Sequence, residues 1–422
     1  MAMALALVHA TSTAKRPKMD IALHLATKTP YWDQSKNEIP DSSFELVQIQ
    51  QVIRHGSRFP TESNMKEIAA LAQKLESRDL LINKLITNSD TYNVAIEGQL
   101  AKAGGEELEQ FGERTRKSVE DAIPSEYTSE KFILQHTYKS RTKMSAMAKF
   151  FSNPGDVKYI EYSKKNDPLL RFYDQCPRYI NDVKSNPAAT IEYERFMRSP
   201  LMRMATEKVS QRAGMPLNAT DVLTAYSACG FDIALFDDVK EWCSMFDPVT
   251  LQVAEYADDL ETFYEEGGAY PINYEMSAVL FRDIVKQMRA LIEGKSQVVG
   301  NFRFVHGEAT LPLMTLLGYV DKKPLKGMCS VKDIEERNFR TSKYVPFMAN
   351  MDFRLYKRKI SPNMPAAVRQ RMEKEGYFVQ VSVNEVPLPI PGCNTMFCPL
   401  DKYEAIWDKY LTKYDFAASC AV

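Results

Sequence analysis

The residues best suited to chemistry stand where a mostly apolar run ends near residue 54. Residues 45–53 mix aliphatic side chains with glutamines in a pattern that predicts a mostly buried strand. The chain then reads Arg54-His55-Gly56-Ser57-Arg58-Phe59-Pro60, and a helical pattern follows. A loop between a strand and a helix presents free backbone N–H groups to an anion, and guanidinium groups bind phosphate oxygens in pairs. The segment therefore predicts a site that holds a phosphate group and attacks it.

A second junction of the same kind carries another arginine. Residues 132–136 predict a strand, and Ser140 and Arg141 follow it, ahead of a helix expected over residues 144–151. If this strand and the first are parallel neighbours, their carboxyl ends lie at one edge of the sheet, where open α/β sheets bind ligands. Arg141 is therefore a candidate phosphate ligand. The alternative is a solvated residue at a helix start.

A third strand end carries a histidine and a carboxylate. Residues 301–306 predict a strand that delivers His306, Gly307 and Glu308, and an apolar helix is expected over residues 311–317. A carboxyl group beside a bound polyanion is disfavoured in its charged form, so its pKa should rise and make it a proton donor. The alternative role for Glu308 is a first-turn carboxylate that the helix dipole stabilises.

The segment at residues 54–60 resembles the signature of the histidine phosphatases, in the branch that holds acid phosphatases and phytases. Every specified position of Arg-His-Gly-x-Arg-x-Pro is present. The resemblance implies that His55 is the nucleophile and becomes phosphorylated, and that Glu308 is the proton donor. The phosphate ligands that it implies are Arg54, Arg58, Thr61, Arg141 and His306.

Other segments are similar to one subgroup of that branch, the multiple inositol polyphosphate phosphatases. The subgroup has His-Ala-Glu where other acid phosphatases have His-Asp, and residues 306–308 follow the first pattern with a departure at Gly307. The further similar segments are residues 26–31, 229–232, 242–243, 391–393 and 398–400. The resemblance implies hydrolysis of phosphomonoesters on highly phosphorylated small molecules, with inositol hexakisphosphate as the first candidate and 2,3-bisphosphoglycerate as a further one.

Two rival functions share the same residues. A broad-specificity acid phosphatase that acts on other esters would have every catalytic residue in common with an inositol polyphosphate phosphatase. A non-catalytic relative that only binds polyanions would bind the ligand without turnover, and the presence of both His55 and Glu308 argues against it. A mutase is disfavoured because nothing in the sequence marks recapture of the phosphoryl group by the product.

The elements that must position these residues predict a two-part α/β protein. We expect a mainly parallel sheet flanked by helices, with an inserted, mostly α-helical cap domain. The expected parts are an N-terminal arm (1–40), an α/β catalytic domain (41–152 plus 298–422) and the cap (153–297). Helices are expected at 65–80, 106–122, 191–211 with a break at 199–200, 220–228, 274–292 and 403–414, with late strands at 345–355 and 378–386 and an irregular stretch at 158–179.

Composition excludes several classes of partner. The 422 residues carry a formal net charge of −1, which argues against a nucleic-acid partner held by bulk charge. No apolar run approaches the length needed to span a bilayer. We expect no metal or other cofactor, because arginines supply the positive charge and no Cys-x-x-Cys pair occurs. Of the five histidines, His9 and His24 lie in the arm, and His136 is expected in a core or hydrogen-bonded role.

Seven cysteines bear on the compartment. The spacing of Cys393 and Cys398 suits a local disulfide, and Cys229 and Cys243 could close a larger loop. The alternative is a set of buried thiols in a cytosolic protein, and the odd count leaves at least one cysteine free or intermolecular. Residues 1–14 hold a short apolar run without a basic region before it. We expect the secretory pathway or the extracellular space; the sequence predicts no oligomeric state.

Overall fold

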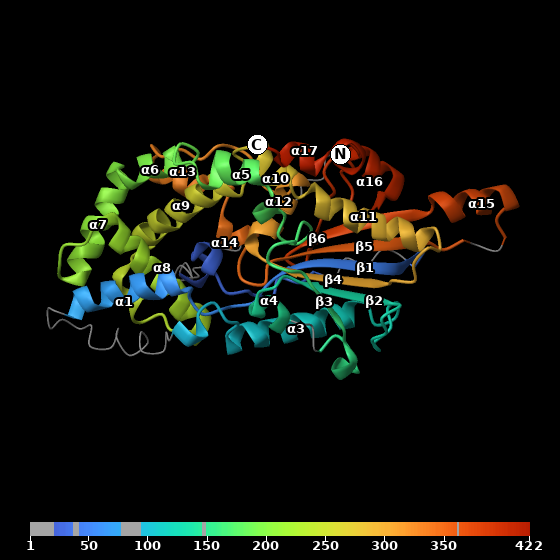
Figure 1. Cartoon of the computed structure of the whole chain (residues 1–422), viewed down its shortest axis with the longest axis horizontal. Helices are drawn as coiled ribbons and strands as arrows, with labels where there is room; N and C mark the ends of the chain where they lie inside the picture. The colour runs from blue at the N-terminus through green and yellow to red at the C-terminus, as the bar shows by residue number, and fades with distance from the viewer. Residues whose placement is uncertain (1–20, 37–41, 77–93, 146–148, 361–362) are drawn as a thin grey trace, which may run out of the picture.

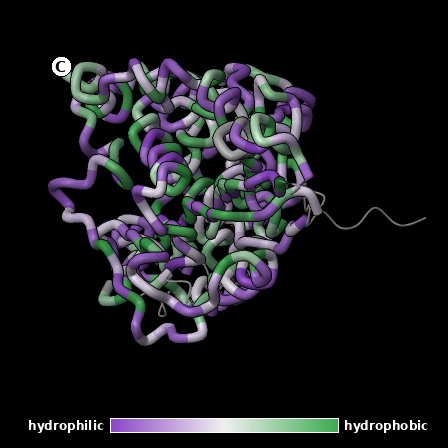
Figure 2. Tube along the Cα trace, turned by 90° about the vertical axis from the view of Figure 1, so that its right-hand side faces the viewer, coloured by the Kyte–Doolittle hydropathy of each residue, from purple (hydrophilic) through white to green (hydrophobic). Residues whose placement is uncertain are grey.

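A single sheet runs through the centre of the computed structural model, which describes residues 21–36, 42–76, 94–145, 149–360 and 363–422. The strand order is β3-β2-β4-β1-β5-β6-β7, and β8 pairs with β6. The strands are β1 Phe44–Arg54, β2 Phe132–His136, β3 Tyr159–Glu161, β4 Gly300–Val305, β5 Asn350–Arg358, β6 Tyr377–Val383, β7 Val386–Leu388 and β8 Cys398–Pro399. The central strands β1, β4 and β5 are almost wholly buried, and Figure 2 shows hydrophobic stretches of the trace in the interior of the molecule.

The sheet is mixed, so the expectation of a mainly parallel sheet is wrong. Strands β3, β2, β4 and β1 are parallel, whereas β5, β6, β7 and β8 pair antiparallel. Antiparallel strands can be joined by short turns, whereas parallel strands need long crossovers. Between β6 and β7 the chain turns through Asn384 and Glu385, both with positive φ, as a tight hairpin turn requires. The broader expectation of an α/β protein is confirmed.

Helices cover both faces of the sheet (Figure 1). Helix α3 (Lys102–Ser118) lies on one face, and α11 (Ala278–Ile292) with α12 (Gly307–Leu316) lies on the other. The buried Gln50 of β1 donates to the Ile284 carbonyl of α11 at 2.8 Å. Gln48 donates to the Val298 carbonyl at 2.6 Å. Gln48 and Gln50 are therefore satisfied polar groups inside the core, whereas the buried Oε1 of Gln51 has no partner among the described residues.

A second group of helices extends from one end of the sheet (Figure 1). Its main members are α6 Ile191–Met197, α7 Pro200–Ala213, α8 Ala219–Phe236, α9 Pro248–Glu265, α10 Pro271–Glu275, α13 Val331–Glu336 and α14 Thr341–Tyr344. The predicted break at residues 199–200 is confirmed, because Ser199 caps α7 by accepting from the Met202 N–H and Pro200 takes the first helical position. Helix α9 was not predicted, and α8 is longer than expected.

Several predicted boundaries differ from the structure. Helix α3 begins at Lys102, so Gly104 and Gly105 lie inside the helix instead of ending the segment before it. The helix after β2 is the short α4 (Ser140–Met144), which contains Arg141. The other differences are the split of 274–292 into α10 and α11, the end of α16 (Leu400–Ile406) before a separate π-helical turn Lys409–Lys413, the later start of β5, and the strand β3 in a stretch expected to be irregular.

Strand β3 and helix α11 come from the 153–297 range yet belong to the sheet layer. Strand β3 pairs with β2, and α11 accepts hydrogen bonds from β1. The three-part division by residue range therefore stays a prediction. Helix α1 (Glu62–Glu76) follows the first motif as expected, and it packs on α8 of the second helix group.

Three disulfides link the chain. Cys229–Cys243 and Cys393–Cys398 are confirmed, and Cys176–Cys420 joins residues 244 apart in sequence, which was not predicted. Cys329 forms no disulfide with any described residue. The apolar run within residues 1–14 and His9 lie outside the described residues. Among the helices that are described, none has the length and apolar character to cross a membrane.

Candidate active site

The carboxyl ends of three parallel strands meet at one edge of the sheet. Arg54 at the end of β1 is in register with Val305 of β4, and His136 at the end of β2 is in register with Phe304. The residues that follow these strands therefore lie side by side, with α4, α12 and α14 gathered at the same end (Figure 1). The rings of His55 and His306 confirm the proximity, since their centres are 5.4 Å apart.

His55 is buried and held in one tautomer. Its Nδ1 lies 2.9 Å from the Gly56 carbonyl oxygen. A carbonyl can only accept, so Nδ1 carries the hydrogen and Nε2 presents its lone pair. Burial, and then the charges of Arg141 and Arg54, hold the pKa of His55 well below its ordinary value. The ring is thus neutral with a free Nε2, which is the form that a nucleophile requires.

His306 holds Arg141 in place. Arg141 Nη2 donates to His306 Nδ1 at 3.3 Å, and His306 Nε2 donates to Thr137 Oγ1 at 2.9 Å. Burial keeps the pKa of His306 well below its ordinary value, so the ring is neutral. The sequence predicts a hydrogen bond from His306 to the phosphoryl oxygens. In this structure both ring nitrogens are engaged with protein groups, which favours a role in orienting Arg141.

Three guanidinium groups converge on this edge. The Nε atoms of Arg54, Arg58 and Arg141 are buried and have no hydrogen-bond partner within the described residues. Burial lowers the pKa of Arg54 to about 10. Burial, and then Arg141 and Arg54, lower that of Arg58 to about 9. Positive charge is therefore concentrated on buried groups, where an anion would relieve both the repulsion and the unmet hydrogen bonds.

Glu308 lies in the first turn of α12 and acts electrostatically on all three arginines. Burial pushes its pKa up, but its backbone N–H at the helix start, Arg54 and Arg141 together hold that pKa below the ordinary value. A bound phosphate would cancel the effect of the arginines and leave that of burial. The predicted rise in the pKa of Glu308 therefore depends on the substrate.

Glu266 is a second carboxyl group at the site, and sequence reasoning missed it. Burial and the charge of Glu308 raise its pKa well above the ordinary value. The protonated form is therefore favoured at Glu266, whereas the arginines favour the ionised form of Glu308. The signal that could have revealed it is the position directly before Gly267 and Gly268, where a turn was expected.

Glu107 of α3 fixes the loop after His55, and it was also missed. Its carboxylate accepts from the Ser57 N–H at 2.9 Å and from the Ser57 hydroxyl at 2.8 Å. The loop lies so close to α3 that a Cβ atom on Gly56 would be 2.4 Å from the Gly104 carbonyl oxygen. Both glycines are needed for this approach. The signal for this close approach in the sequence was the adjacent pair Gly104 and Gly105.

Thr61 caps helix α1. Its hydroxyl donates to Asn64 Oδ1 at 2.9 Å, and the Asn64 N–H donates to Thr61 Oγ1 at 3.4 Å. This is a structural use of the side chain. Its role as a phosphate ligand stays a prediction.

Cationic and aromatic side chains continue beyond the three arginines. Arg171 Cζ lies 5.2 Å from the ring centres of both Tyr138 and Tyr173. Lys139 Nζ lies 5.2 Å from the Tyr138 ring, and Lys184 Nζ lies 6.0 Å from the Tyr173 ring. Arg171 also contributes to the low pKa of His306. We call these five residues the cationic rim. No group of His, Cys, Asp and Glu side chains in the described part of the chain is arranged to hold a metal ion.

This chain is similar to a described family and to solved structures. The "Histidine phosphatase superfamily (branch 2)" matches residues 45–384. Multiple inositol polyphosphate phosphatase 1 of Homo sapiens is 29% identical over 390 residues, covering 84% of this chain and 77% of that protein. The phytase from D. castellii superposes with a TM-score of 0.76 at 16% identity, covering 95% of this chain and 87% of the phytase. The Bifidobacterium longum multiple inositol polyphosphate phosphatase, solved with inositol hexasulfate, superposes with a TM-score of 0.71 at 14% identity, covering 90% and 96%.

Proposed function

Because this chain belongs to branch 2 of the histidine phosphatase superfamily, we propose that it hydrolyses phosphomonoesters of inositol polyphosphates through a phosphohistidine on His55. The observation that carries the proposal is the neutral His55, with its Nε2 lone pair free, among three arginines whose Nε donors have no partner in the described chain. Such a cluster is complete only when a phosphoryl group occupies it.

The cationic rim supports a substrate with more than one phosphate. A single phosphoryl group is served by Arg54, Arg58 and Arg141, so further cations at Arg171 and Lys184 favour additional negative charge on the substrate. The relative in Homo sapiens carries the name of an inositol polyphosphate phosphatase, which agrees with this preference. We propose inositol hexakisphosphate as the first substrate and 2,3-bisphosphoglycerate as a further one.

In the first step the Nε2 lone pair of His55 attacks phosphorus, and the bond from phosphorus to the alcohol oxygen breaks. The arginines cancel the negative charge that would repel the ring and hold the three non-bridging oxygens. Glu308 gives its proton to the leaving oxygen, so the products are an inositol hydroxyl and an N-phosphorylated His55. The Nδ1–H bond to Gly56 keeps Nε2 aimed during the attack.

In the second step the Glu308 carboxylate takes a proton from water, and the water oxygen attacks phosphorus. The N–P bond then breaks, which releases inorganic phosphate and returns His55 to its neutral form. Glu308 is thereby protonated again for the next cycle. Glu266 interacts electrostatically with Glu308, and its raised pKa makes it the proposed source of the proton on Glu308 when the substrate cancels the charge of the arginines.

We also propose that the protein works in the secretory pathway or outside the cell. Its three disulfides are consistent with an oxidising compartment. The helices of the 153–297 range other than α11 would form a cap over the site, as in the expected two-part architecture.

The test is phosphate release from inositol hexakisphosphate by the wild type, His55→Ala and Glu308→Gln. We expect a loss of about 10³-fold or more for His55→Ala, because the covalent route is removed. Glu308→Gln should lose about 10²- to 10⁴-fold in kcat/KM with alcohol leaving groups. It should lose much less in kcat/KM with p-nitrophenyl phosphate, because kcat/KM reports the first step and this leaving group needs no proton there. Wild-type rates for His55→Ala would contradict the nucleophile assignment.

A substrate panel separates the rivals. A broad-specificity phosphatase would show similar kcat/KM for inositol hexakisphosphate and simple aryl phosphates. A binding protein would show affinity for inositol hexakisphosphate with no phosphate release by any variant. The matched control is Lys139→Met with Lys184→Met in the cationic rim, which should raise KM for inositol hexakisphosphate and leave p-nitrophenyl phosphate hydrolysis nearly unchanged.

A further inference from the structure

A short N-terminal segment, residues 24–31, reaches the phosphate site from outside the sheet, and we call it the strap. The Thr27 carbonyl accepts a hydrogen bond from Arg54 Nη1 at 2.7 Å. Four residues on, the Tyr31 N–H donates at 3.4 Å to Glu107, the carboxylate that binds Ser57. The strap therefore contacts Arg54, which directly precedes the nucleophile, and Glu107, which binds the loop that follows it. Nothing in the proposed chemistry uses these contacts.

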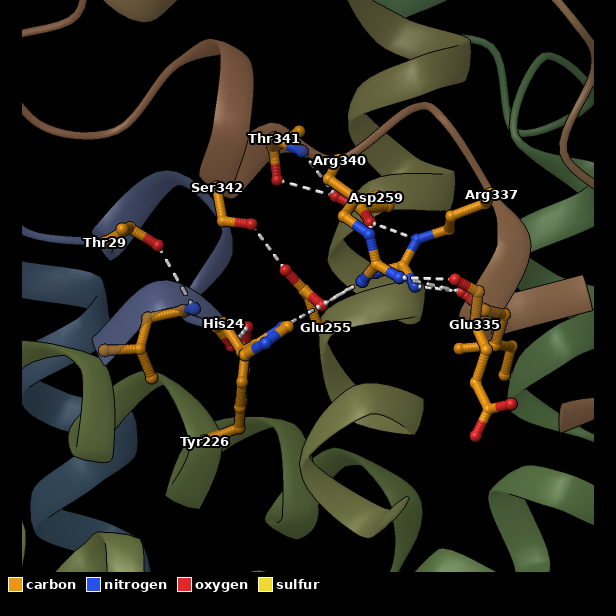
Figure 3. Close-up of polar contacts among 12 residues, drawn as sticks. His24, Thr29, Tyr226, Glu255, Asp259, Glu335, Arg337, Arg340, Thr341 and Ser342 are labelled. Atoms are coloured by element: carbon orange, nitrogen blue, oxygen red, sulfur yellow. Dashed lines mark hydrogen bonds and ion pairs between the residues drawn. The ribbon is translucent and has the colours of Figure 1, made fainter. Parts of the chain in front are cut away.

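Side chains outside the site hold the strap against helix α9. His24 Nδ1 lies 3.1 Å from Glu255 Oε2, and Lys28 Nζ lies 3.2 Å from Asp258 Oδ2. Tyr226 of α8 donates its hydroxyl proton to the His24 carbonyl at 2.8 Å. Figure 3 shows His24 beside both Tyr226 and Glu255. The position of the strap thus depends on the second helix group.

The strap has a fixed internal shape. The Leu25 N–H donates to Thr29 Oγ1 at 3.1 Å, and the Phe347 N–H donates to the Thr29 carbonyl at 2.9 Å. Ala26 is buried with φ of 49°, in the left-handed region. That conformation is strained for an alanine because its Cβ crowds the backbone, so it persists only because the surrounding contacts impose it.

Gly230 of α8 provides the seat of the strap. A Cβ atom at this position would lie 3.0 Å from the Lys28 Cβ and 3.7 Å from the Leu25 Cβ. The next residue, Phe231, places its ring 5.7 Å from the Arg58 guanidinium carbon. The three arginines of the site (Arg54, Arg58 and Arg141) are called the clamp arginines below. One turn of α8 therefore supports two of them, Arg58 directly and Arg54 through the strap. This accounts for residues 26–31 and 229–232, which the catalytic chemistry leaves without a role.

We propose that the strap is a positioning element of the phosphate site, in which Lys28 and Gly230 hold the Thr27 carbonyl where it orients the Arg54 guanidinium. The proposal rests on the proposed function, since the oriented group is taken to bind a phosphoryl group. Arg54 Nη1 also donates to the Val345 carbonyl at 2.6 Å, so both of its protons are directed to backbone oxygens. The plane of the guanidinium is thereby set, which leaves Nε and Nη2 for the anion.

The first test is Lys28→Met against the matched control Lys74→Met. Lys74 of α1 pairs with Asp221 of α8 at 2.5 Å, an ion pair to the same helix group that does not touch the strap. We expect Lys28→Met to lower kcat/KM for p-nitrophenyl phosphate roughly tenfold, because misplacing a catalytic group by about 1 Å can cost about 10²-fold. Lys28→Arg should restore most of the rate, and Lys74→Met should stay within about twofold of wild type.

The decisive measurement is a double-mutant cycle with Arg54→Ala. If Lys28 acts through Arg54, the penalties are not additive, and Lys28→Met has no further effect in the Arg54→Ala background. Gly230→Ala can replace Lys28→Met in the same cycle, and it should likewise lower kcat/KM in the wild-type background and have no further effect in the Arg54→Ala background. Additive penalties, or a loss for Lys28→Met that Lys74→Met reproduces, would overturn the proposal.

Failure of the proposed function gives a different result. If the wild type releases no phosphate from any ester, the same cycle is measured as binding of inorganic phosphate by calorimetry. The positioning role then predicts weaker binding for Lys28→Met in the wild-type background and unchanged binding in the Arg54→Ala background. Equal weakening in both backgrounds would overturn the positioning role independently of turnover.

Discussion

Two clusters of buried charge in this protein differ in whether their charges are matched. Around Arg337, every charged group has a partner: Arg337 binds Glu255 at 2.8 Å and Asp259 at 2.6 Å. The remaining carboxylate oxygens of these acids accept from Ser342 at 2.6 Å and from Thr341 at 2.7 Å (Figure 3). At the phosphate site, by contrast, the Nε donors of three arginines have no partner in the described chain.

The pKa values of the two clusters differ in the effect of the neighbouring charges. Burial opposes ionisation of Glu255, yet His24 and Arg337 hold its pKa at about 2. Asp259 in the same cluster is raised to about 6 by burial. At the phosphate site, neighbouring arginines add to burial and lower the pKa of Arg58 to about 9. Both clusters are buried, so burial alone does not mark a functional site, whereas unmatched charge does.

The largest effect is expected when a clamp arginine is removed. Arg141→Met should lower kcat/KM by about 10³-fold or more, as loss of an arginine that stabilises a transferring phosphoryl group does. The free energy of unfolding should change little, because the substitution removes the repulsion of Arg54 and Arg58 together with the attraction to Glu308. Urea unfolding and steady-state kinetics check the two parts. A loss of stability parallel to the loss of activity would remove the distinction between the clusters.

Arg337→Met is the counterpart in the matched cluster. It leaves Glu255 and Asp259 buried without their shared cation, and breaking a buried ion pair in this way costs about 3–5 kcal/mol of stability. The kcat of the folded fraction should stay close to wild type. Urea unfolding with kinetics at low temperature measures both. An unfolding free energy no lower than that of Arg141→Met would contradict the comparison.

The carboxyl pair at the site should give stability changes of opposite sign. The pKa of Glu266 is raised on folding, so its ionisation weakens the fold above the unfolded-state value of about 4.3. Glu266→Gln should therefore stabilise the protein at pH 7, by about 1.4 kcal/mol for each unit of pKa difference, and have little effect at pH 4.

Glu308 provides the reverse case. Its pKa is lowered on folding, so its contribution is present above the unfolded-state value and is lost as pH falls through the folded value. Glu308→Gln should destabilise the protein at pH 7. Urea unfolding of both variants at pH 4, 5.5 and 7 decides the matter. If both substitutions changed the free energy of unfolding in the same direction, Glu266 and Glu308 would not respond oppositely to the charges of the site.

The smallest effect is expected at Gly307. A Cβ atom there would lie 3.6 Å from Arg54 Nε, an ordinary contact, and the position opens α12. Gly307→Ala should stabilise the fold by about 0.4–1 kcal/mol, because it restricts the unfolded chain. Thermal or urea unfolding measures the gain. A loss of stability would show that the space beside Arg54 is too small for an alanine, the residue that the multiple inositol polyphosphate phosphatases have at this position.

Sequence reasoning found the parts of the site that are local in the chain. A strand, a loop and a helix within residues 45–76 follow from periodicity, and each of the three junctions was recognised separately. The supports of the site are not local: Glu107 meets Ser57 from 50 residues away, and Thr27 meets Arg54 from a segment with no periodicity. No spacing in one sequence encodes such contacts.

The same limit explains the errors in the fold. The residue pattern of a short apolar strand does not depend on the direction in which the strand pairs. The strands β5 and β6 were therefore recognised, but their antiparallel pairing was not. Local disulfides at spacings of 5 and 14 residues were anticipated, whereas the Cys176–Cys420 bridge was not, because any two of seven cysteines at long range are equally plausible partners. The pKa of Glu308 depended on arginines whose positions only the tertiary structure gives.

The Cys176–Cys420 bridge joins residues 244 apart in sequence and closes the chain between them into a covalent ring. A protease that cuts the ring once would leave both products attached to each other by the sulfur link and by the strands and helices that still pack together. Nicked protein should therefore run as a single band in a denaturing gel without reductant and as two fragments with it.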